Sequence, residues 1–173
     1  MNTATQPAKH SSSIDPRHFR DTLGHYASGL TIITGDDNGE PLGFTCQSFY
    51  SVSVEPPLIS FSVMKTSTTY PRIRETGKFA VNVLAHHQHA VANQFARSGT
   101  DKWVGITWNP TAGGNPILAD SLIWIDCTIH AEYEAGDHFI VVGAVNELIS
   151  SERHQLEPLL FFKGQYRHLK NGD

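Results

Sequence analysis

The segment formed by residues 43–67 constrains the fold more than any other part of the chain. Apolar residues alternate with small polar ones on both sides of the Pro56–Pro57 pair. The apolar members are Val52, Val54, Ile59, Phe61 and Val63. Alternation with a period of two residues predicts two antiparallel β-strands. The polar face is unusual because nearly all of its side chains are small hydroxyls: Thr45, Ser48, Ser51, Ser53, Ser60 and Ser62.

A flat ligand could lie against such a face, since small side chains and free backbone amides leave room for it. Residues able to bind an anion follow the second strand, where a short helix is expected to begin: Lys65, Ser67, Thr68 and Thr69. A planar polar ring with a phosphate tail would suit both halves of the segment. The same spacing is equally compatible with an ordinary β-hairpin whose serine face is solvated.

Length and charge narrow the class of protein. The 173 residues suffice for one domain with a sizeable core, and the net charge of -4 does not favour nucleic acid or an anionic membrane as a partner. No apolar run approaches the roughly 20 residues of a membrane span. Residues 1–13 are polar and lack the apolar core of a signal peptide. We therefore expect a disordered lead-in followed by a single domain over residues 14–173.

The two cysteines, Cys46 and Cys127, both lie inside predicted strands. Two such thiols are expected to fill the core rather than to form a disulfide framework. The expected compartment is therefore a reducing cytoplasm.

The N-terminal part of the domain predicts a helix, a strand and a tight turn. Asp15 can cap a helix that opens at Pro16. One apolar face of this helix would be formed by Phe19, Leu23 and Tyr26. Residues 30–34 are rich in β-branched side chains and predict a strand, and the Asn-Gly pair at 38–39 predicts a turn after it.

The remainder of the chain is dominated by strand patterns. Ser67 or Thr68 can cap a short helix that stops at Gly77. Strands are expected at residues 79–83, 123–133, 139–149 and 159–162, and a further helix at residues 87–96. The strand at 139–149 is apolar on both faces up to Val145, so we expect it to be central. Strands outnumber helices and no strand–helix–strand alternation occurs. We therefore predict a mainly β protein, an antiparallel barrel with peripheral helices.

Residues 98–115 show no steady period. We expect them to form an ordered loop in which Trp103 and Trp108 are partly buried.

Several classes of site find little support in the sequence. It contains no G-x-G-x-x-G fingerprint and no G-x-x-x-x-G-K-[ST] loop, which argues against a Rossmann or P-loop nucleotide site. Among His86, His87 and His89, neighbours one and two residues apart do not share a helix face, and no Cys or acidic partner lies at a recognised spacing, so a solvated cluster is favoured over a metal site. Cys46 has no evident base beside it. His138 follows a tight turn, where it could reach a site at the barrel rim or bond to the backbone of its hairpin.

Six motifs, taken in order, resemble one family. They are F-R-x-x-L-G-x-Y-x-S-G-L-T from Phe19, Q-S-F from Gln47, V-E-P-P-L from Val54, F-A-V-N-V-L from Phe79, G-D-H from Gly136 and P-L-L-F-F-x-G-x-Y from Pro158. Each motif is weak alone, but their combination over residues 14–168 is specific. The pattern is similar to that of the short-chain flavin reductases, the small reductase components of two-component flavin-dependent monooxygenases.

The resemblance implies a split β-barrel of the FMN-binding, flavin reductase-like type, usually a homodimer. It implies NAD(P)H-dependent reduction of FMN or FAD. The reduced flavin then diffuses to a separate monooxygenase, which commonly hydroxylates an aromatic compound. No arginine cluster marks a site for the 2′-phosphate of NADPH, so NADH is favoured, and FAD is slightly favoured over FMN.

The resemblance also implies a set of site residues by position. The isoalloxazine would be lined by Gly43, Phe44, Thr45, Gln47 and Ser48, and then by Ser62, Val63 and Met64. The flavin phosphate would be held by Lys65, Ser67, Thr68 and Thr69. The remainder would be enclosed by Asn82, Val83, Leu84, Phe95 and Lys102. The nicotinamide would face His138, the catalytic residue, and Tyr166, and residues 155–158 could close over NADH.

In this interpretation the flavin supplies the redox chemistry and the protein supplies orientation and electrostatics. His138 would orient the nicotinamide rather than move a proton, and amide donors near Gln47 and Ser48 would stabilise charge on the flavin. Three alternatives remain. They are a non-enzymatic flavin-binding or electron-transfer protein on the same barrel, a pyridoxamine-phosphate oxidase-like enzyme with a denser basic cluster, and a structural module with a serine-faced sheet.

Overall fold

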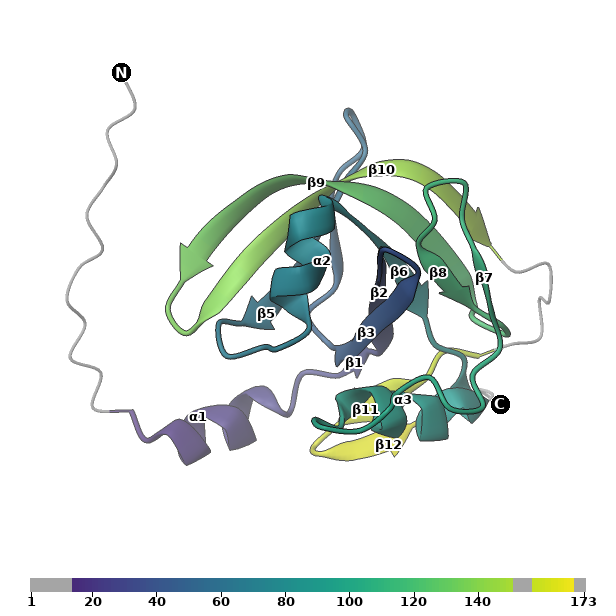
Figure 1. Cartoon of the computed structure of the whole chain (residues 1–173). Coiled ribbons are helices and arrows are strands. Elements are labelled where there is room, and N and C mark those ends of the chain that lie inside the picture. Colours follow the sequence, from purple (N-terminus) through teal and green to yellow (C-terminus); the bar gives the residue numbers. More distant parts are fainter. Residues whose placement is uncertain (1–13, 151–156, 170–173) are drawn as a thin grey trace, which may run out of the picture.

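A computed structural model describes residues 14–150 and 157–169 of the chain. Its main element is a seven-stranded antiparallel sheet with the strand order β3-β2-β6-β9-β10-β5-β4 (Figure 1). These strands are β2 (Thr31–Asp37), β3 (Glu40–Cys46), β4 (Tyr50–Ser53), β5 (Leu58–Met64), β6 (Lys78–Val83), β9 (Ile123–Ala135) and β10 (His138–Ser150). The mainly β prediction is confirmed.

Smaller elements pack around this sheet. The helices are α1 (Pro16–Leu23), α2 (Tyr70–Thr76) and α3 (His89–Ala96), with the 3-10 turn η1 (His86–Gln88) before α3. The short strands are β1 (Ser28–Gly29), β7 (Trp108–Pro110), β8 (Pro116–Leu118), β11 (Leu160–Phe162) and β12 (Gln165–Arg167). Strands β1, β11 and β12 form a second small sheet, which lies with α3 below the main sheet in the view of Figure 1.

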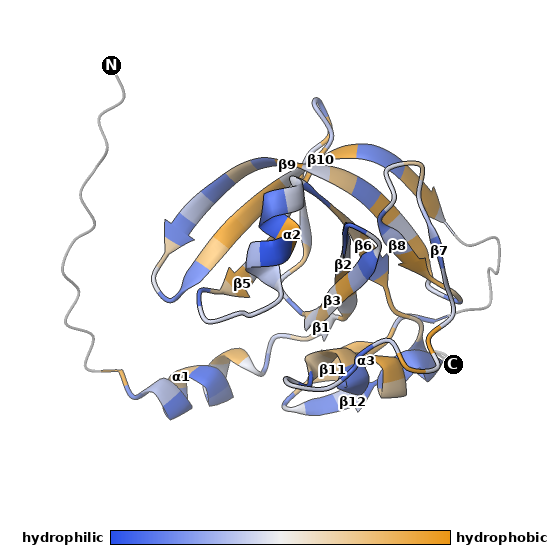
Figure 2. Ribbon diagram, in the orientation of Figure 1, coloured by the Kyte–Doolittle hydropathy of each residue, from blue (hydrophilic) through white to orange (hydrophobic). Residues whose placement is uncertain are grey.

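The long hairpin of β9 and β10 is the centre of the fold. Its turn at Gly136 has a φ of 64°, a conformation that glycine adopts at little cost. Strand β10 pairs with β9 on one side and with β5 on the other, so the predicted central position is confirmed. Apolar and polar residues are interspersed along both strands (Figure 2). A β-carbon at Gly143 would lie 2.5 Å from Cζ of Phe79, so only glycine lets that ring lie so close to the backbone of β10.

The segment at residues 43–67 contributes to three strands rather than two. Its first residues complete β3, and the predicted antiparallel pair corresponds to β4 and β5. Ile59, Phe61 and Val63 of β5 are buried as their alternation predicts. Val52 is exposed instead, because β4 lies at the edge of the sheet and pairs only with β5, and Val54 is exposed in the turn that follows this strand.

The predicted start of α1 and both ends of α2 agree with the structure, but α1 stops at Leu23, so Tyr26 lies beyond the helix face on which it was expected. Asp15 caps α1, with Oδ2 accepting a hydrogen bond from the His18 amide at 2.7 Å. Ser67 Oγ accepts from the Tyr70 amide at 3.1 Å, and α2 stops at Gly77 with a φ of 71°. No residue of α1 is buried, so its apolar residues are not part of the core. None of the helices in the described ranges is long and apolar enough to cross a membrane.

Cys46 and Cys127 are buried free thiols, as predicted. Trp103 and Trp108 are half-buried in the loop after α3, which also forms the short β7–β8 hairpin that the sequence did not predict. The predicted disordered lead-in at residues 1–13 lies outside the described residues, and so do residues 155–156 of the expected NADH-covering loop.

Candidate functional site

A cavity of about 560 Å³ opens where β3, β5 and α3 come together. Most of the site residues expected from the sequence line it: Phe44, Thr45, Gln47, Ser48, Ser62, Val63, Met64, Ser67, Thr68, Thr69, Phe95, Lys102 and His138. They come from five separate parts of the chain. The sheet order explains how they meet, because β10 pairs with β5 and sets His138 directly opposite Met64.

Ser48 fixes the chain between β3 and β4 against β5. Its Oγ accepts a hydrogen bond from the Ser62 amide at 2.7 Å and donates one to the Ser62 carbonyl at 3.0 Å. The thiol of Cys46 lies 3.3 Å from the same oxygen. The Ser48 hydroxyl therefore already donates one hydrogen bond and accepts another within the protein. A ligand on this wall would meet backbone groups and small side chains.

Helix α3 supports the same wall from behind. Thr45 Oγ1 donates to the Ala92 carbonyl at 2.6 Å, which ties β3 to the helix. Phe95 is fully buried against β3, a contact that contributes roughly 1.5–3 kcal/mol for a side chain of this size. The approach is possible because residue 43 is glycine: a β-carbon there would lie 2.6 Å from Cε1 of Phe95.

The cation of this cavity is Lys102. Its Nζ donates to the Gly43 carbonyl at 3.0 Å, and burial lowers the pKa of the amine below its usual value. No ion pair joins it to a carboxylate within the described residues. A half-buried amine without a carboxylate partner favours the binding of an anion, which would restore the stability of its charged form.

Lys65, the lysine expected at the phosphate, does not line the cavity. Its Nζ is 2.9 Å from Oε2 of Glu134 and lies over the Phe139 ring at 5.4 Å from the centroid. The hydrogen bond from Lys65 lowers the pKa of the Glu134 carboxyl. The partner lies on the β9–β10 hairpin, far away in the sequence, so the local motif gave no indication of this pair.

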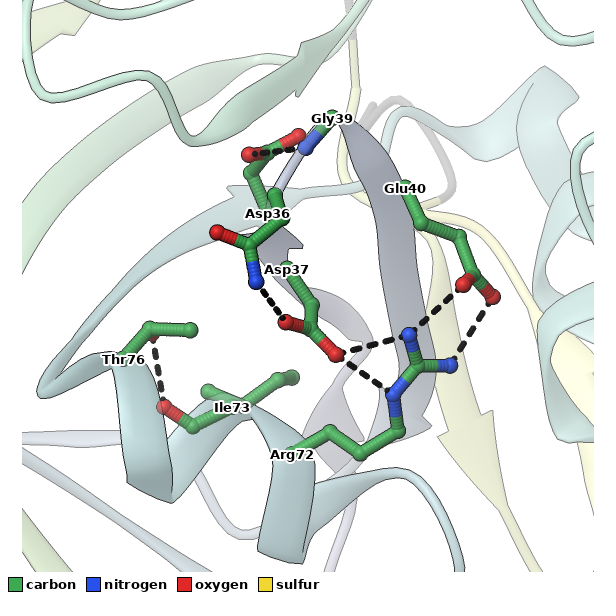
Figure 3. Close-up of polar contacts among 8 residues, drawn as sticks. Asp36, Asp37, Gly39, Glu40, Arg72, Ile73 and Thr76 are labelled. Atoms are coloured by element: carbon green, nitrogen blue, oxygen red, sulfur yellow. Dashed lines mark hydrogen bonds and ion pairs between the residues drawn. The ribbon is translucent and has the colours of Figure 1, made fainter.

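The hydroxyl-rich segment at residues 66–69, before α2, is held in place by the contacts of Arg72 (Figure 3). Arg72 Nε donates to Asp37 Oδ2 at 2.8 Å, and its two terminal nitrogens donate to Glu40 at 2.8 and 2.7 Å. This bidentate contact lowers the pKa of the Glu40 carboxyl. It joins α2 to the β2–β3 hairpin, so residues 66–69 and the start of β3 are fixed relative to each other.

His138 lines the same cavity as Lys102 and lies at the tip of the β9–β10 hairpin. Its Nδ1 is 2.7 Å from Oδ1 of Asp137, and the side chain is 38% exposed. The hydrogen bond from His138 lowers the pKa of the Asp137 carboxyl. Asp137 therefore orients the ring and leaves Nε2 as the nitrogen available to a ligand.

The remaining expected residues lie outside this cavity. Asn82 is fully buried, and its amide bonds to Ile32, Thr34 and Leu118 hold β2, β6 and β8 together. Leu84 is buried and Val83 is half-buried, and neither lines the cavity. The Tyr166 hydroxyl donates to Asn93 Oδ1 at 2.7 Å on α3.

Four lining residues were not expected from the sequence: Cys46, Thr66, Ala96 and Ser98. Cys46 and Thr66 lie within the serine-rich segment and could have been included. Ala96 and Ser98 carry no sequence motif, because the fold of the loop after α3 places them.

The structure gives little support to metal or thiol chemistry. No group of three His, Cys, Asp or Glu side chains suited to a metal ion occurs in the part of the chain that the structure describes. Burial raises the pKa of the Cys46 thiol, and burial together with Asp126 raises that of Cys127 to about 12. Neither thiol is therefore activated as a nucleophile.

Residues 23–170 match the model of a family described as flavin reductase like domain. Among curated proteins, the chain is 44% identical over 156 residues to the reductase subunit HsaB of a flavin-dependent monooxygenase from Mycobacterium tuberculosis H37Rv. The match covers 90% of this chain and 83% of HsaB.

Two solved structures are similar over most of the chain. Nitrilotriacetate monooxygenase component B from Mycobacterium thermoresistibile has a TM-score of 0.87 at 42% identity, with coverage of 89% of this chain and 86% of the other. The NADH:FAD oxidoreductase SgcE6 of Streptomyces globisporus C-1027, in complex with NAD and FAD fragments, has a TM-score of 0.84 at 32% identity, with coverage of 92% and 98%.

Proposed function

Because the chain belongs to the family of flavin reductase-like domains, we propose that the cavity between β3, β5 and α3 is where it reduces FMN or FAD with NADH. The chain is an NAD(P)H:flavin oxidoreductase, a reductase component that supplies reduced flavin to a partner monooxygenase. The observation that carries the proposal is the arrangement of one cavity between a cation, Lys102, and a rim histidine, His138.

The residues of the cavity fit a flavin. The wall formed by residues 44–48 and 62–64 carries mostly small side chains, and two of its hydroxyls, on Thr45 and Ser48, are bonded inside the protein. A flat ring can lie against such a wall without displacing a side chain. The hydroxyls of Ser67, Thr68 and Thr69 and the amine of Lys102 are suited to a phosphate.

Two groups of residues in the cavity bind different parts of the ligands in this proposal. A bound flavin supplies the hydride acceptor. Lys102 and the hydroxyls of residues 67–69 hold the phosphate and thereby fix the position of the ring. His138, oriented by Asp137, positions the nicotinamide over it. Hydride transfer needs no general base, so His138 does not have to move a proton.

The finer assignments are also proposals. NADH is favoured over NADPH because no arginine cluster lines the cavity within the described residues.

We take residues 14–173 as one domain and the compartment as a reducing cytoplasm, which suits the two free thiols. The exposed apolar residues Phe19 and Leu23 of α1, with Tyr26 just after it, support a homodimer. An aromatic compound is the proposed substrate of the partner monooxygenase.

The test is the rate of NADH oxidation by the purified protein with each flavin. Loss of the reduced-nicotinamide absorbance that depends on FMN or FAD supports the proposal. Flavin binding without NADH oxidation would favour the electron-transfer alternative. Tight binding of pyridoxal phosphate, or no binding of either flavin, would favour the oxidase-like or the structural alternative.

A further inference from the structure

We propose that Gln94, in the last turn of α3, is a positioning residue for the flavin phosphate, because it fixes the backbone of Lys102. The inference rests on the proposed function, since it requires that Lys102 binds this phosphate. Gln94 does not line the cavity itself. It would therefore act through the lysine and determine how strongly the protein prefers phosphorylated flavins to riboflavin.

The side-chain amide of Gln94 bonds twice to the loop that follows its helix. Its Nε2 donates to the Lys102 carbonyl and to the Val104 carbonyl, each at 2.9 Å. A side-chain amide has two N–H donors, so these bonds use both of them. The two acceptors flank Trp103, and one planar group thus fixes the backbone on both sides of that residue.

The loop needs such an anchor because it has no regular structure. Residues 97–107, between α3 and β7, form turns and bends. Two hydrogen bonds are local to the loop: the Trp103 amide donates to Asp101 Oδ1 at 2.9 Å, and the Ile106 amide donates to the Trp103 carbonyl at 3.0 Å. They shape the turn without joining it to α3. The Trp103 ring, 5.0 Å from the Phe95 centroid, adds an apolar contact to that helix.

Lys102 is consequently held at both ends. Its carbonyl is bonded to α3 through Gln94, and its Nζ donates to the Gly43 carbonyl on β3 at 3.0 Å. An ammonium group has three N–H donors, so the bond to Gly43 leaves donors for phosphate oxygens. A lysine fixed in this way loses less conformational freedom when an anion binds than a lysine on a free loop.

Loss of the Gln94 contacts should affect one part of the ligand only. A loop released from α3 would carry the amine of Lys102 away from the cavity in a fraction of the molecules. The apparent affinity for a phosphorylated flavin then falls in proportion to the fraction that keeps the competent arrangement. Riboflavin has the same ring and ribityl chain but no phosphate, so its affinity should not change.

The experiment measures the dissociation constants of FMN and riboflavin by fluorescence titration. Gln94→Met keeps a side chain of similar length but has no N–H donor. It should weaken FMN about fivefold and leave riboflavin unchanged. Gln94→His can replace one donor with its Nε2–H group and should recover part of the loss. The matched control is Asn93→Leu on the same helix, whose side chain accepts from Tyr166; it should leave the ratio of the two affinities unchanged.

A double-mutant cycle with Lys102→Gln tests whether Gln94 acts through the lysine. In the Lys102→Gln background, Gln94→Met should have no further effect on the binding of FMN. A general loss of stability would persist in that background. Additive effects of the two substitutions on FMN would therefore overturn the inference, and so would an equal loss of FMN and riboflavin affinity in Gln94→Met.

Failure of the inference can be distinguished from failure of the proposed function. If Gln94→Met does not fold, Gln94→His decides, and an unchanged ratio of FMN to riboflavin affinity in that variant overturns the inference. If the wild-type protein binds neither flavin and does not oxidise NADH, the proposed function fails as well. Active NADH oxidation, with the wild-type affinity ratio retained in both Gln94 variants, overturns the inference alone.

Discussion

Gly43 and Phe95 are packed so closely that a β-carbon on residue 43 would lie 2.6 Å from Cε1 of the ring. The ring is fully buried and cannot move away without disturbing α3. Gly43→Ala should therefore destabilise the protein by about 1–3 kcal/mol, the usual cost of overpacking, and should also weaken flavin binding. Urea unfolding and flavin titration measure the two effects.

Gly143→Ala is the control for this prediction. A β-carbon there would lie 2.5 Å from Phe79 Cζ, so a comparable loss of stability is expected far from the cavity. Flavin affinity should be retained in that variant. An equal loss of affinity in both variants would mean that Gly43 affects binding only through global stability.

Ser48 is predicted to stabilise the cavity wall rather than to bind flavin with its hydroxyl. Ser48→Ala leaves the part-buried Ser62 amide without its partner, which should cost about 1–3 kcal/mol in the free energy of unfolding. Ser51→Ala, at an exposed serine of β4, should be close to neutral. If Ser48→Ala keeps full stability and loses only flavin affinity, the hydroxyl acts on the ligand instead.

The two lysines of the anion-binding region should differ in effect. Lys102→Gln should weaken FMN about tenfold and leave riboflavin unchanged, because it removes a charge-assisted contact to phosphate. Lys65→Gln should change neither, since Lys65 pairs with Glu134. If Lys65→Gln weakens the binding of FMN and Lys102→Gln does not, the phosphate is bound by Lys65, as the sequence resemblance implies.

His138→Ala should raise the KM for NADH about tenfold while the dissociation constant of the flavin is unchanged, because the side chain is expected to contact the nicotinamide. The exposed His130→Ala on β9 is the matched control. Steady-state kinetics and flavin titration separate the two parameters. Unchanged kinetics in His138→Ala would remove this residue from the site.

Stability should fall as the solution becomes acidic. The pKa values of Glu40, Glu134 and Asp137 are all lowered in the folded protein by hydrogen bonds from Arg72, Lys65 and His138. A carboxyl with a lowered folded-state pKa adds stability above its unfolded pKa of about 4, and this is lost as the pH falls through the folded value.

Arg72→Gln isolates the Glu40 contribution. It should reduce the fall in melting temperature between neutral and acidic pH, because the pKa of Glu40 returns toward its ordinary value. Arg74→Gln, on the same helix but paired with Glu132, is the comparison. An unchanged pH profile in Arg72→Gln would show that the exposed pair contributes nothing measurable.

Much of the architecture follows from local sequence rules. The Asp15 cap, the Gly77 stop and the central position of β10 could be predicted because each depends on a few neighbouring residues or on a long apolar run. The exposure of Val52 could not, because alternation identifies a strand but does not reveal that it lies at an edge. The alternation also continues to Val54, which lies in the turn after β4.

The site was predictable where it follows consecutive residues and less so where it depends on distant partners. Thr45 to Ser48 and Ser67 to Thr69 line the cavity as the motifs suggest. Asn82 faces the interior because Leu118, from a hairpin 36 residues later, donates its amide to it. The position of Ser98 depends on the path of a loop without any periodic pattern.

The internal hydrogen bonds of Thr45 and Ser48 have a consequence for the direction of flavin exchange. A wall whose hydroxyls are already bonded has few side-chain groups that can tell an oxidised ring from a reduced one. Only differential affinity can shift an equilibrium between two ligand forms. If the reductase binds both forms of the flavin equally, the direction of net flavin transfer depends on the affinity of the acceptor protein for the reduced form.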